Sequence, residues 1–153
     1  MLSLLSTLSY ANAADTNAWK GRSVYQLLTD RFAKDQPDGN ACGNLSAYCG
    51  GTYKGIENNL DYIQGMGFDA IWISPVVDNI GDGYHGYWAG NWEKTNDHFG
   101  SPDDLKSMIN ACHKRGIYVM VDVVANHVAP IGMDFGQIYP FNRAEHYHDR
   151  CDI

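Results

Sequence analysis

The chain has 153 residues, of which 44% are hydrophobic and 19% are charged, and its formal net charge is −7. This length suits one ordinary domain, and the hydrophobic content is enough for a core and argues against disorder. The acidic balance argues against nucleic acid as a partner, because like charges repel. No stretch after the first residues is long and apolar enough for a transmembrane helix, so we expect no membrane partner.

Residues 1–13 (MLSLLSTLSYANA) have features of a secretory signal peptide. A short apolar segment from Leu2 to Leu8 precedes Ala11-Asn12-Ala13, which has the small-x-small form of a signal-peptidase site. The segment lacks a basic amino-terminal region, which leaves a frayed terminus as the alternative. We expect a secreted, extracellular protein.

Residues 23–29 are predicted to form the first strand, and residues 30–52 are predicted to form a loop. Within this loop, Cys42 and Cys49 flank the sequon Asn44-Leu45-Ser46, which predicts a glycosylated Asn44. Loops closed by a disulfide are common in secreted proteins, so we predict a Cys42–Cys49 bridge. Cys112 is predicted to be a buried free thiol on a helix face, and Cys151 has no obvious partner.

The rest of the chain predicts an alternation of helices and strands. Residues 56–66 read as a helix, residues 70–74 as a strand and residues 76–100 as a long loop. A second helix is predicted to begin at the N-cap Ser101 with Pro102 at its first position, and to end before Gly116. Residues 117–124 then form an apolar strand. This order predicts an α/β fold with a parallel sheet covered on both faces.

Ligands of parallel sheets and barrels bind where the carboxyl ends of the strands meet the following loops. The stretch Tyr84-His85-Gly86-Tyr87-Trp88 lies in such a loop, and its aromatic rings suit the C–H faces of a sugar. The alternative is an aromatic plug without a ligand. This edge of the sheet is therefore the predicted binding site.

Three polar residues lie on or directly after the last predicted strand. Asp122 lies on the strand among apolar neighbours and must be paired or hydrogen-bonded, either for function or only as a satisfied buried acid. Asn126 offers an amide oxygen that suits calcium, or it forms a turn. His127 has the options of binding a ligand hydroxyl, binding a metal or simply packing.

The stretch Glu145-His146-Tyr147-His148-Asp149 has the composition of a transition-metal tract. It contains no thiolate and no helical pair of histidines. A metal-binding module of a different α/β class is therefore kept as a weaker hypothesis.

Four stretches together resemble secreted fungal α-amylases of the Taka-amylase type: VYQLLTDRFA, CGGTYKGIENNLDYIQGMGFDAIWISPV, YHGYW and RGIYVMVDVVANHV. The resemblance covers roughly residues 22–130. It implies a (β/α)8 TIM barrel, of which this chain holds about the first three β/α units. Residues 14–130 are then the amino-terminal part of the barrel, and residues 131–153 begin the small domain B.

The resemblance also implies roles for the residues at the strand ends. The family hydrolyses internal α-1,4-glucosidic bonds of starch and retains the anomeric configuration. The implied roles are calcium ligand for Asn126, hydrogen bond to the sugar before the cleaved bond for His127, stacking beneath that sugar for Tyr87, a neighbouring substrate contact for Trp88, polar support for His85, and ordering of the active-site floor for Asp122.

Retaining hydrolysis needs a carboxylate nucleophile and a carboxylic acid about 5 Å apart, and in this family both follow later strands. We therefore expect an inactive amino-terminal fragment of a calcium-dependent parent that binds starch or maltooligosaccharides as a monomer. The alternatives are a fragment that binds maltooligosaccharides without catalysis, and a parent of the α-glucosidase or glucanotransferase type. Two departures stand out: residues 77–83 are shorter than usual, and Ser46 replaces a substrate-contacting glutamine.

Overall fold

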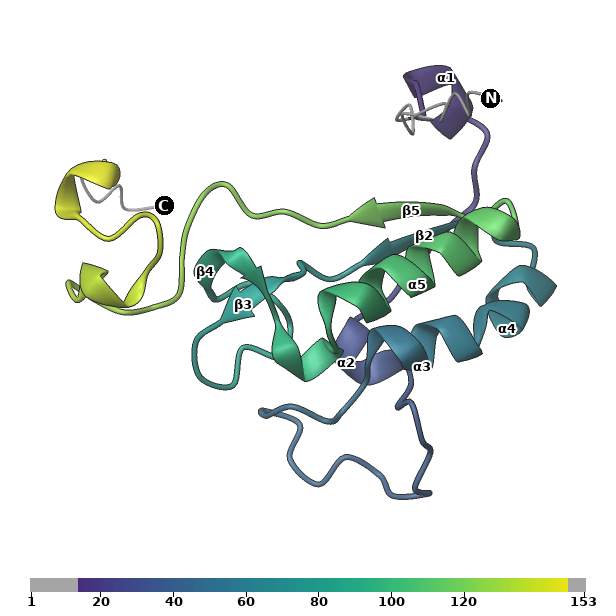
Figure 1. Cartoon of the computed structure of the whole chain (residues 1–153), viewed down its shortest axis with the longest axis horizontal. Coiled ribbons are helices and arrows are strands. Elements are labelled where there is room, and N and C mark those ends of the chain that lie inside the picture. The colour runs from purple at the N-terminus through teal and green to yellow at the C-terminus, as the bar shows by residue number, and fades with distance from the viewer. Residues whose placement is uncertain (1–13, 149–153) are drawn as a thin grey trace, which may run out of the picture.

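The structure is a computed structural model that describes residues 14–148 (Figure 1). The signal-like segment 1–13 and Cys151 lie outside the described residues. None of the helices within residues 14–148 combines the length and the apolar character needed to cross a membrane.

A three-stranded parallel sheet forms the centre of the fold. Its strands are β1 (Val24–Gln26), β2 (Ala70–Ile73) and β5 (Tyr118–Val121), in the order β1-β2-β5. The register places Tyr25 beside Ile71 and Ile71 beside Val119. The predicted parallel sheet is confirmed, although β1 and β5 are shorter than the predicted strands.

Helix α5 (Pro102–Lys114) begins and ends where its sequence signals predict. The Ser101 hydroxyl accepts a hydrogen bond from the Asp104 amide, and the Asp104 carboxylate accepts one from the Ser101 amide, which completes a capping box. The hydrogen bonds from Ser101 lower the pKa of Asp104. Gly116, with φ 71°, follows the helix in the left-handed region.

The helix predicted over residues 56–66 is instead two helices, α3 (Tyr53–Asn58) and α4 (Leu60–Gly65). The break lies at Asn59, whose backbone is not helical (φ −114°, ψ 17°) and whose side-chain amide donates to the Gly55 carbonyl at 2.8 Å. This local bond competes with the helical backbone pattern. The apolar spacing survives the break, since Ile56, Leu60 and Ile63 are all fully buried.

The predicted loop 76–100 contains a hairpin that the sequence analysis missed. Strand β3 (Val77–Asn79) pairs antiparallel with β4 (Ala89–Thr95), and a 3-10 helix (Asp97–Phe99) follows. The β4 edge also pairs with the later chain, since the Trp92 amide donates to the Tyr139 carbonyl at 2.9 Å. The amides of Ala129 and Tyr139 also donate to the β4 carbonyls of Ala89 and Gly90. The predicted domain boundary at residue 130 stays a prediction.

Two short helices also depart from the predicted pattern. Helix α1 (Thr16–Trp19) precedes the sheet, and α2 (Thr29–Phe32) occupies the end of the predicted first strand and the start of the predicted loop 30–52. Thr29 and Asp30 are buried in α2. The chain therefore turns directly from β1 into a buried helical turn.

The hydrophobic core lies between the sheet and the helices α3, α4 and α5, which cover one side of it (Figure 1). Ile71, Ile73, Met108 and Cys112 are fully buried there. The predicted buried free thiol of Cys112 is confirmed, and burial raises its pKa to about 12.

The sheet has a second face that these helices do not cover. Side chains alternate between the faces of a strand, and Val24, Leu28 and Met120 are 38–40% exposed. The prediction of a sheet covered on both faces is therefore wrong for the described residues. In a closed barrel, this second face would point inward.

Candidate functional site

The predicted site residues lie at the carboxyl end of the parallel sheet. Asp122 follows β5 directly, and its amide donates to the Ile73 carbonyl at the end of β2 at 3.1 Å. The stretch 84–88 lies between β3 and β4, in the connection that follows β2. The topology thus brings residues that follow two different strands, β2 and β5, to the same end of the sheet, as the parallel order requires.

Tyr87 contacts two of the three polar residues that follow β5, Asp122 and His127. Its hydroxyl donates to Asp122 Oδ2 at 2.8 Å, and His127 Nε2 lies 3.1 Å from the Tyr87 carbonyl oxygen. The prediction that Asp122 must be hydrogen-bonded is confirmed. Partial burial raises the pKa of Tyr87, and the hydrogen bond to the Asp122 carboxylate and its charge raise it further. The phenol therefore stays protonated and available as a donor to Asp122.

His85 packs in the middle of the aromatic stretch. Its ring stacks on Tyr87, with centroids 5.7 Å apart and planes at 19°, and meets the Trp88 ring edge-on at 4.9 Å. His85 Nδ1 accepts the backbone N–H of Tyr87 at 3.0 Å. Burial lowers the pKa of His85, so the neutral ring is favoured and Nδ1 keeps its lone pair for this bond.

The backbone around this stretch is held by a close approach and by Asn79. Gly86 has φ 88°, and a Cβ there would lie 2.8 Å from Pro75 Cδ. The Asn79 side chain accepts from the Trp88 amide at 2.7 Å and donates to the Gly86 carbonyl at 3.3 Å. Asn79 lies within the short segment 77–83, so one side chain organises the loop there. We define the aromatic platform as Tyr84, His85, Tyr87 and Trp88.

Asp30 and Arg31 complete the site, and the sequence analysis missed both. Asp30 is almost fully buried; its carboxylate accepts the amides of Cys49 at 2.8 Å and Gly50 at 3.2 Å and forms an ion pair with Arg31 Nε at 2.9 Å. The Arg31 guanidinium lies 3.8 Å above the Tyr84 ring. The only available signal was an acid–base pair at the end of a strand, a pattern that is common on surfaces.

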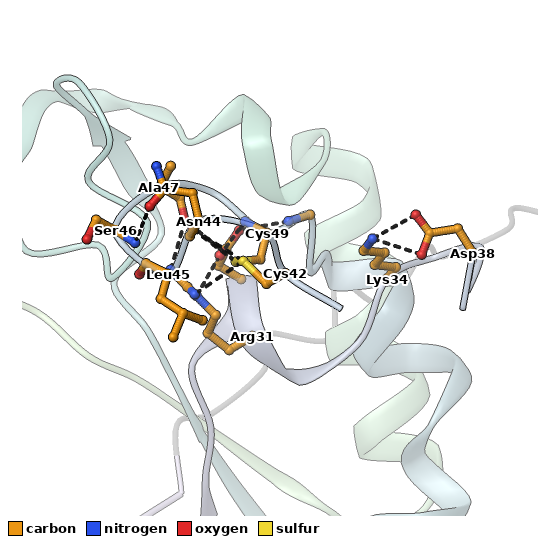
Figure 2. Close-up of a disulfide and its surroundings, with 11 residues drawn as sticks. Arg31, Lys34, Asp38, Cys42, Asn44, Leu45, Ser46, Ala47 and Cys49 are labelled. Atoms are coloured by element: carbon orange, nitrogen blue, oxygen red, sulfur yellow. Dashed lines mark hydrogen bonds and ion pairs between the residues drawn. A yellow bond between two sulfur atoms is a disulfide. The ribbon is translucent and has the colours of Figure 1, made fainter. Parts of the chain in front are cut away.

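The predicted Cys42–Cys49 disulfide is present, with Cα atoms 5.3 Å apart (Figure 2). The loop that it closes carries Asn44, whose side-chain oxygen accepts the Ser46 amide at 2.9 Å. Asn44 and Ser46 are both exposed. The sequon therefore lies on the surface of a closed loop.

A groove of about 820 Å³ is lined by His127 but by none of the four platform residues. It runs past residues 125–132 to the segment 135–148, and its wall includes Trp92, Phe141 and Tyr147. Phe141 meets the Trp92 ring edge-on at 5.6 Å, and Phe135 stacks on Tyr147 at 5.0 Å. The aromatic side chains of the groove wall thus pack against one another in pairs.

Asn126 lines this groove and is exposed, and within residues 14–148 no protein group hydrogen-bonds its side chain. Calcium takes six to eight oxygen ligands. Among the described residues no three His, Cys, Asp or Glu side chains cluster to hold a metal ion. The amide oxygen of Asn126 is thus exposed beside no described group of three such side chains, and its role as a calcium ligand stays a prediction.

The histidines at the end of the described chain line the same groove. His146 and His148 are among its lining residues. Asp149 of the predicted transition-metal tract lies outside the described residues. The part of the tract that the structure describes joins no group of three metal-binding side chains.

The fold and site together match a known class of catalytic domain. The α-amylase catalytic domain profile matches residues 26–148. A solved α-amylase from Malbranchea cinnamomea superposes with a TM-score of 0.84 at 43% identity, over 92% of this chain and 32% of that one. The described sheet and helices are thus part of the (β/α)8 barrel of an amylase-type glycoside hydrolase.

Curated relatives agree with this class. The α-amylase mde5 of Schizosaccharomyces pombe is 47% identical over 163 residues, which cover all of this chain and 31% of the relative. The α-amylase of Saccharomycopsis fibuligera is 44% identical over 172 residues, again over the whole chain and 35% of the relative. The chain belongs to the α-amylase family, and it spans about a third of the length of these relatives.

Proposed function

We propose that this protein takes part in the retaining hydrolysis of internal α-1,4-glucosidic bonds of starch, and that residues 84–127 supply a sugar-binding part of the active site. The observation that carries the proposal is the contact of Tyr87 with both Asp122 and His127 at the carboxyl end of the sheet. Family membership supports the substrate class.

The platform has the chemistry that a glucose unit needs. Trp88 is 38% exposed and Tyr87 is partly exposed, so both rings have surface available for the C–H face of a pyranose. His127 is exposed beside them, and its second ring nitrogen is available for a sugar hydroxyl. Stacking and hydrogen bonding from one edge favour a flat, hydroxyl-rich ligand such as a maltooligosaccharide.

The described residues suit sugar binding, but the acids among them do not suit bond cleavage. Retaining hydrolysis needs two carboxyl groups about 5 Å apart, one as nucleophile and one as acid. The acids that follow β1 and β5 are already engaged: Asp30 is buried under Cys49, Gly50 and Arg31, and Asp122 holds Tyr87. We therefore expect the 153-residue chain to bind maltooligosaccharides and not to hydrolyse them.

Titration with maltopentaose tests this proposal. Saturable quenching of tryptophan fluorescence by the 153-residue chain is expected, with no release of reducing sugar from starch. Trp88→Ala should weaken the binding by up to about tenfold, since stacking on one aromatic ring contributes roughly 0.5–1.5 kcal/mol. Trp19→Ala is the matched control, because Trp19 packs on Tyr118 at the opposite end of the sheet. Starch turnover by the chain alone, or equal losses in both variants, would contradict the proposal.

Asn126 as a calcium ligand is a separate proposal. It is supported by the exposed side-chain amide after β5, which no group among residues 14–148 hydrogen-bonds. Because one amide oxygen falls far short of the six to eight that calcium takes, about 1 mM calcium should leave the melting temperature of the chain unchanged. An increase in melting temperature that Asn126→Ala abolishes would show that this chain holds calcium unaided.

Secretion of a monomeric glycoprotein completes the proposal. The disulfide and the exposed sequon at Asn44 support an oxidising, extracellular setting. Secretory expression should add one N-glycan, seen by mass spectrometry as a mass that Asn44→Gln removes. An unmodified Asn44 in the secreted chain would contradict the glycan part of the proposal.

A further inference from the structure

One arginine anchors the interior of the disulfide loop, residues 42–49. Arg31 Nη2 donates to the Leu45 carbonyl at 2.9 Å and to the Ala47 carbonyl at 2.8 Å, and Nη1 donates to Cys42 Sγ at 3.7 Å (Figure 2). The closed loop therefore presents its carbonyls to a single guanidinium. Charge-assisted bonds of this kind are stronger than those between neutral groups.

The same guanidinium reaches the aromatic platform. It lies 3.8 Å above the Tyr84 ring, and Tyr84 meets His85 edge-on at 5.0 Å. His85 in turn stacks on Tyr87 and contacts Trp88. Direct ring contacts thus run from the disulfide loop to the two rings that we assign to sugar binding.

Arg31 is held in this position from behind. Its ion pair with Asp30 lies in a region where the Asp30 side chain is fully buried and the Arg31 side chain is 20% exposed. Asp30 also accepts the amides of Cys49 and Gly50, so the end of the loop is fixed by the same pair. The loop, the ion pair and Tyr84 therefore share one set of contacts.

We propose that Arg31 is a positioning residue that couples the Cys42–Cys49 loop to the aromatic platform, so that opening the disulfide weakens maltooligosaccharide binding. The ligand in this proposal rests on the proposed function. Opening by a dithiol such as dithiothreitol breaks the S–S bond, gives two protonated cysteine thiols and closes the dithiol to its own disulfide. The opened loop gains conformational freedom, and its carbonyls no longer hold the guanidinium over Tyr84.

Maltopentaose affinity before and after reduction tests the coupling. A Cys151→Ser background keeps bridges between molecules out of the assay. Reduction should weaken the affinity of the otherwise unchanged chain by about tenfold, the size expected for losing one partly desolvated cation–π stack. Oxidised Arg31→Met should already bind about as weakly and should lose little more on reduction. Arg31→Lys keeps the charge but lacks the planar fork, so it should not restore the affinity.

Arg22→Met is the matched control. Arg22 also lies 3.8 Å from a tyrosine ring, that of Tyr118, and forms an ion pair with Asp69, and its side chain is 24% exposed. This cluster lies at the opposite end of the sheet. Arg22→Met should keep the full affinity difference between the oxidised and reduced forms. An Arg31→Met chain that responds to reduction like the unchanged chain would overturn the proposal, as would an affinity that reduction leaves unchanged.

Amide hydrogen exchange over residues 84–88, measured without sugar, separates this proposal from the proposed function. Exchange should rise on reduction, and it should already be raised in oxidised Arg31→Met. Coupled exchange without any maltopentaose binding would refute the sugar site and support the coupling. Sugar binding with exchange that ignores the disulfide would refute the coupling alone. If Arg31→Met does not fold, Arg31→Lys takes its place in both measurements: oxidised Arg31→Lys should already show weakened binding and raised exchange, and an oxidised Arg31→Lys chain that behaves like the unchanged chain would overturn the proposal.

Discussion

The two ends of the parallel sheet carry the same chemical arrangement in different surroundings. At the amino ends of the strands, Arg22 stacks on Tyr118 and pairs with Asp69. At the carboxyl ends, Arg31 stacks on Tyr84 and pairs with Asp30. Both guanidinium carbons lie 3.8 Å from the ring centroid, so the stacks themselves do not distinguish the two ends.

The difference lies in the acids and in what the arginines hold. The Asp69 side chain is 44% exposed, whereas that of Asp30 is fully buried. Arg22 bonds carbonyls at the ends of regular elements, at Ala18 and Gly116, whereas Arg31 bonds carbonyls inside a loop. In barrel enzymes the amino-terminal end serves stability and the carboxyl-terminal end carries the site. The two arginine clusters follow this division, although they contain the same three residue types.

Removing the acid from each cluster should give the largest difference in stability between the two ends. Asp30→Ala leaves a poorly solvated arginine and two amides without their partner, so it should lower the free energy of unfolding by about 3–5 kcal/mol. Asp69→Ala removes a solvated pair and one bond to the Ser23 amide, so it should cost about 1 kcal/mol. Urea denaturation followed by circular dichroism measures both. Equal losses would mean that burial does not separate the two clusters.

The glycines beside the two clusters give the next largest effect. Gly116→Ala places an alanine at φ 71° in open space, which should cost about 1–2 kcal/mol. Gly86→Ala has a similar backbone strain at φ 88° and also meets Pro75, so it should cost roughly 3 kcal/mol. Only Gly86→Ala should also weaken maltopentaose binding, because it moves the platform. A Gly116→Ala variant with the larger loss of affinity would reverse the assignment of the two ends.

Local signals explain which elements could be predicted from the sequence. Ser101, Pro102 and Gly116 fix the ends of α5 through contacts within a few residues, and that helix forms as expected. The β3–β4 pairing was missed because β4 reads AGNWEKT, without alternation, and forms only through its register with distant chain. The break at Asn59 was missed because a side-chain bond to Gly55 leaves the apolar spacing intact.

The site divides in the same way. The need of Asp122 for a partner follows from a carboxylate among apolar residues, and the structure supplies Tyr87. Which group fills that need depends on the crossover between two strands, which no local pattern records. Asp30 and Arg31 show the same limit, because their partners at Cys49 and Tyr84 come from other loops.

The smallest predicted effect is the pH dependence of sugar binding at the carboxyl end of the sheet. Because burial lowers the pKa of His85, the unfolded chain binds this proton more readily than the folded one. The contribution of His85 to stability is therefore complete at neutral pH and is lost as the pH falls below its ordinary value of 6.5. A protonated Nδ1 also cannot accept the Tyr87 amide, so the platform should loosen.

Maltopentaose affinity should accordingly fall by about fivefold between neutral pH and pH of about 5, the worth of one hydrogen bond. His85→Gln should bind more weakly at neutral pH and should lose this part of the pH dependence. His127→Gln separates the second histidine at the site, because it leaves the bond between His85 and Tyr87 in place. His127→Gln should keep the pH dependence, whereas a pH dependence that persists in His85→Gln would contradict the role of His85. Protonation of His85 would then have no effect on the sugar affinity of the platform.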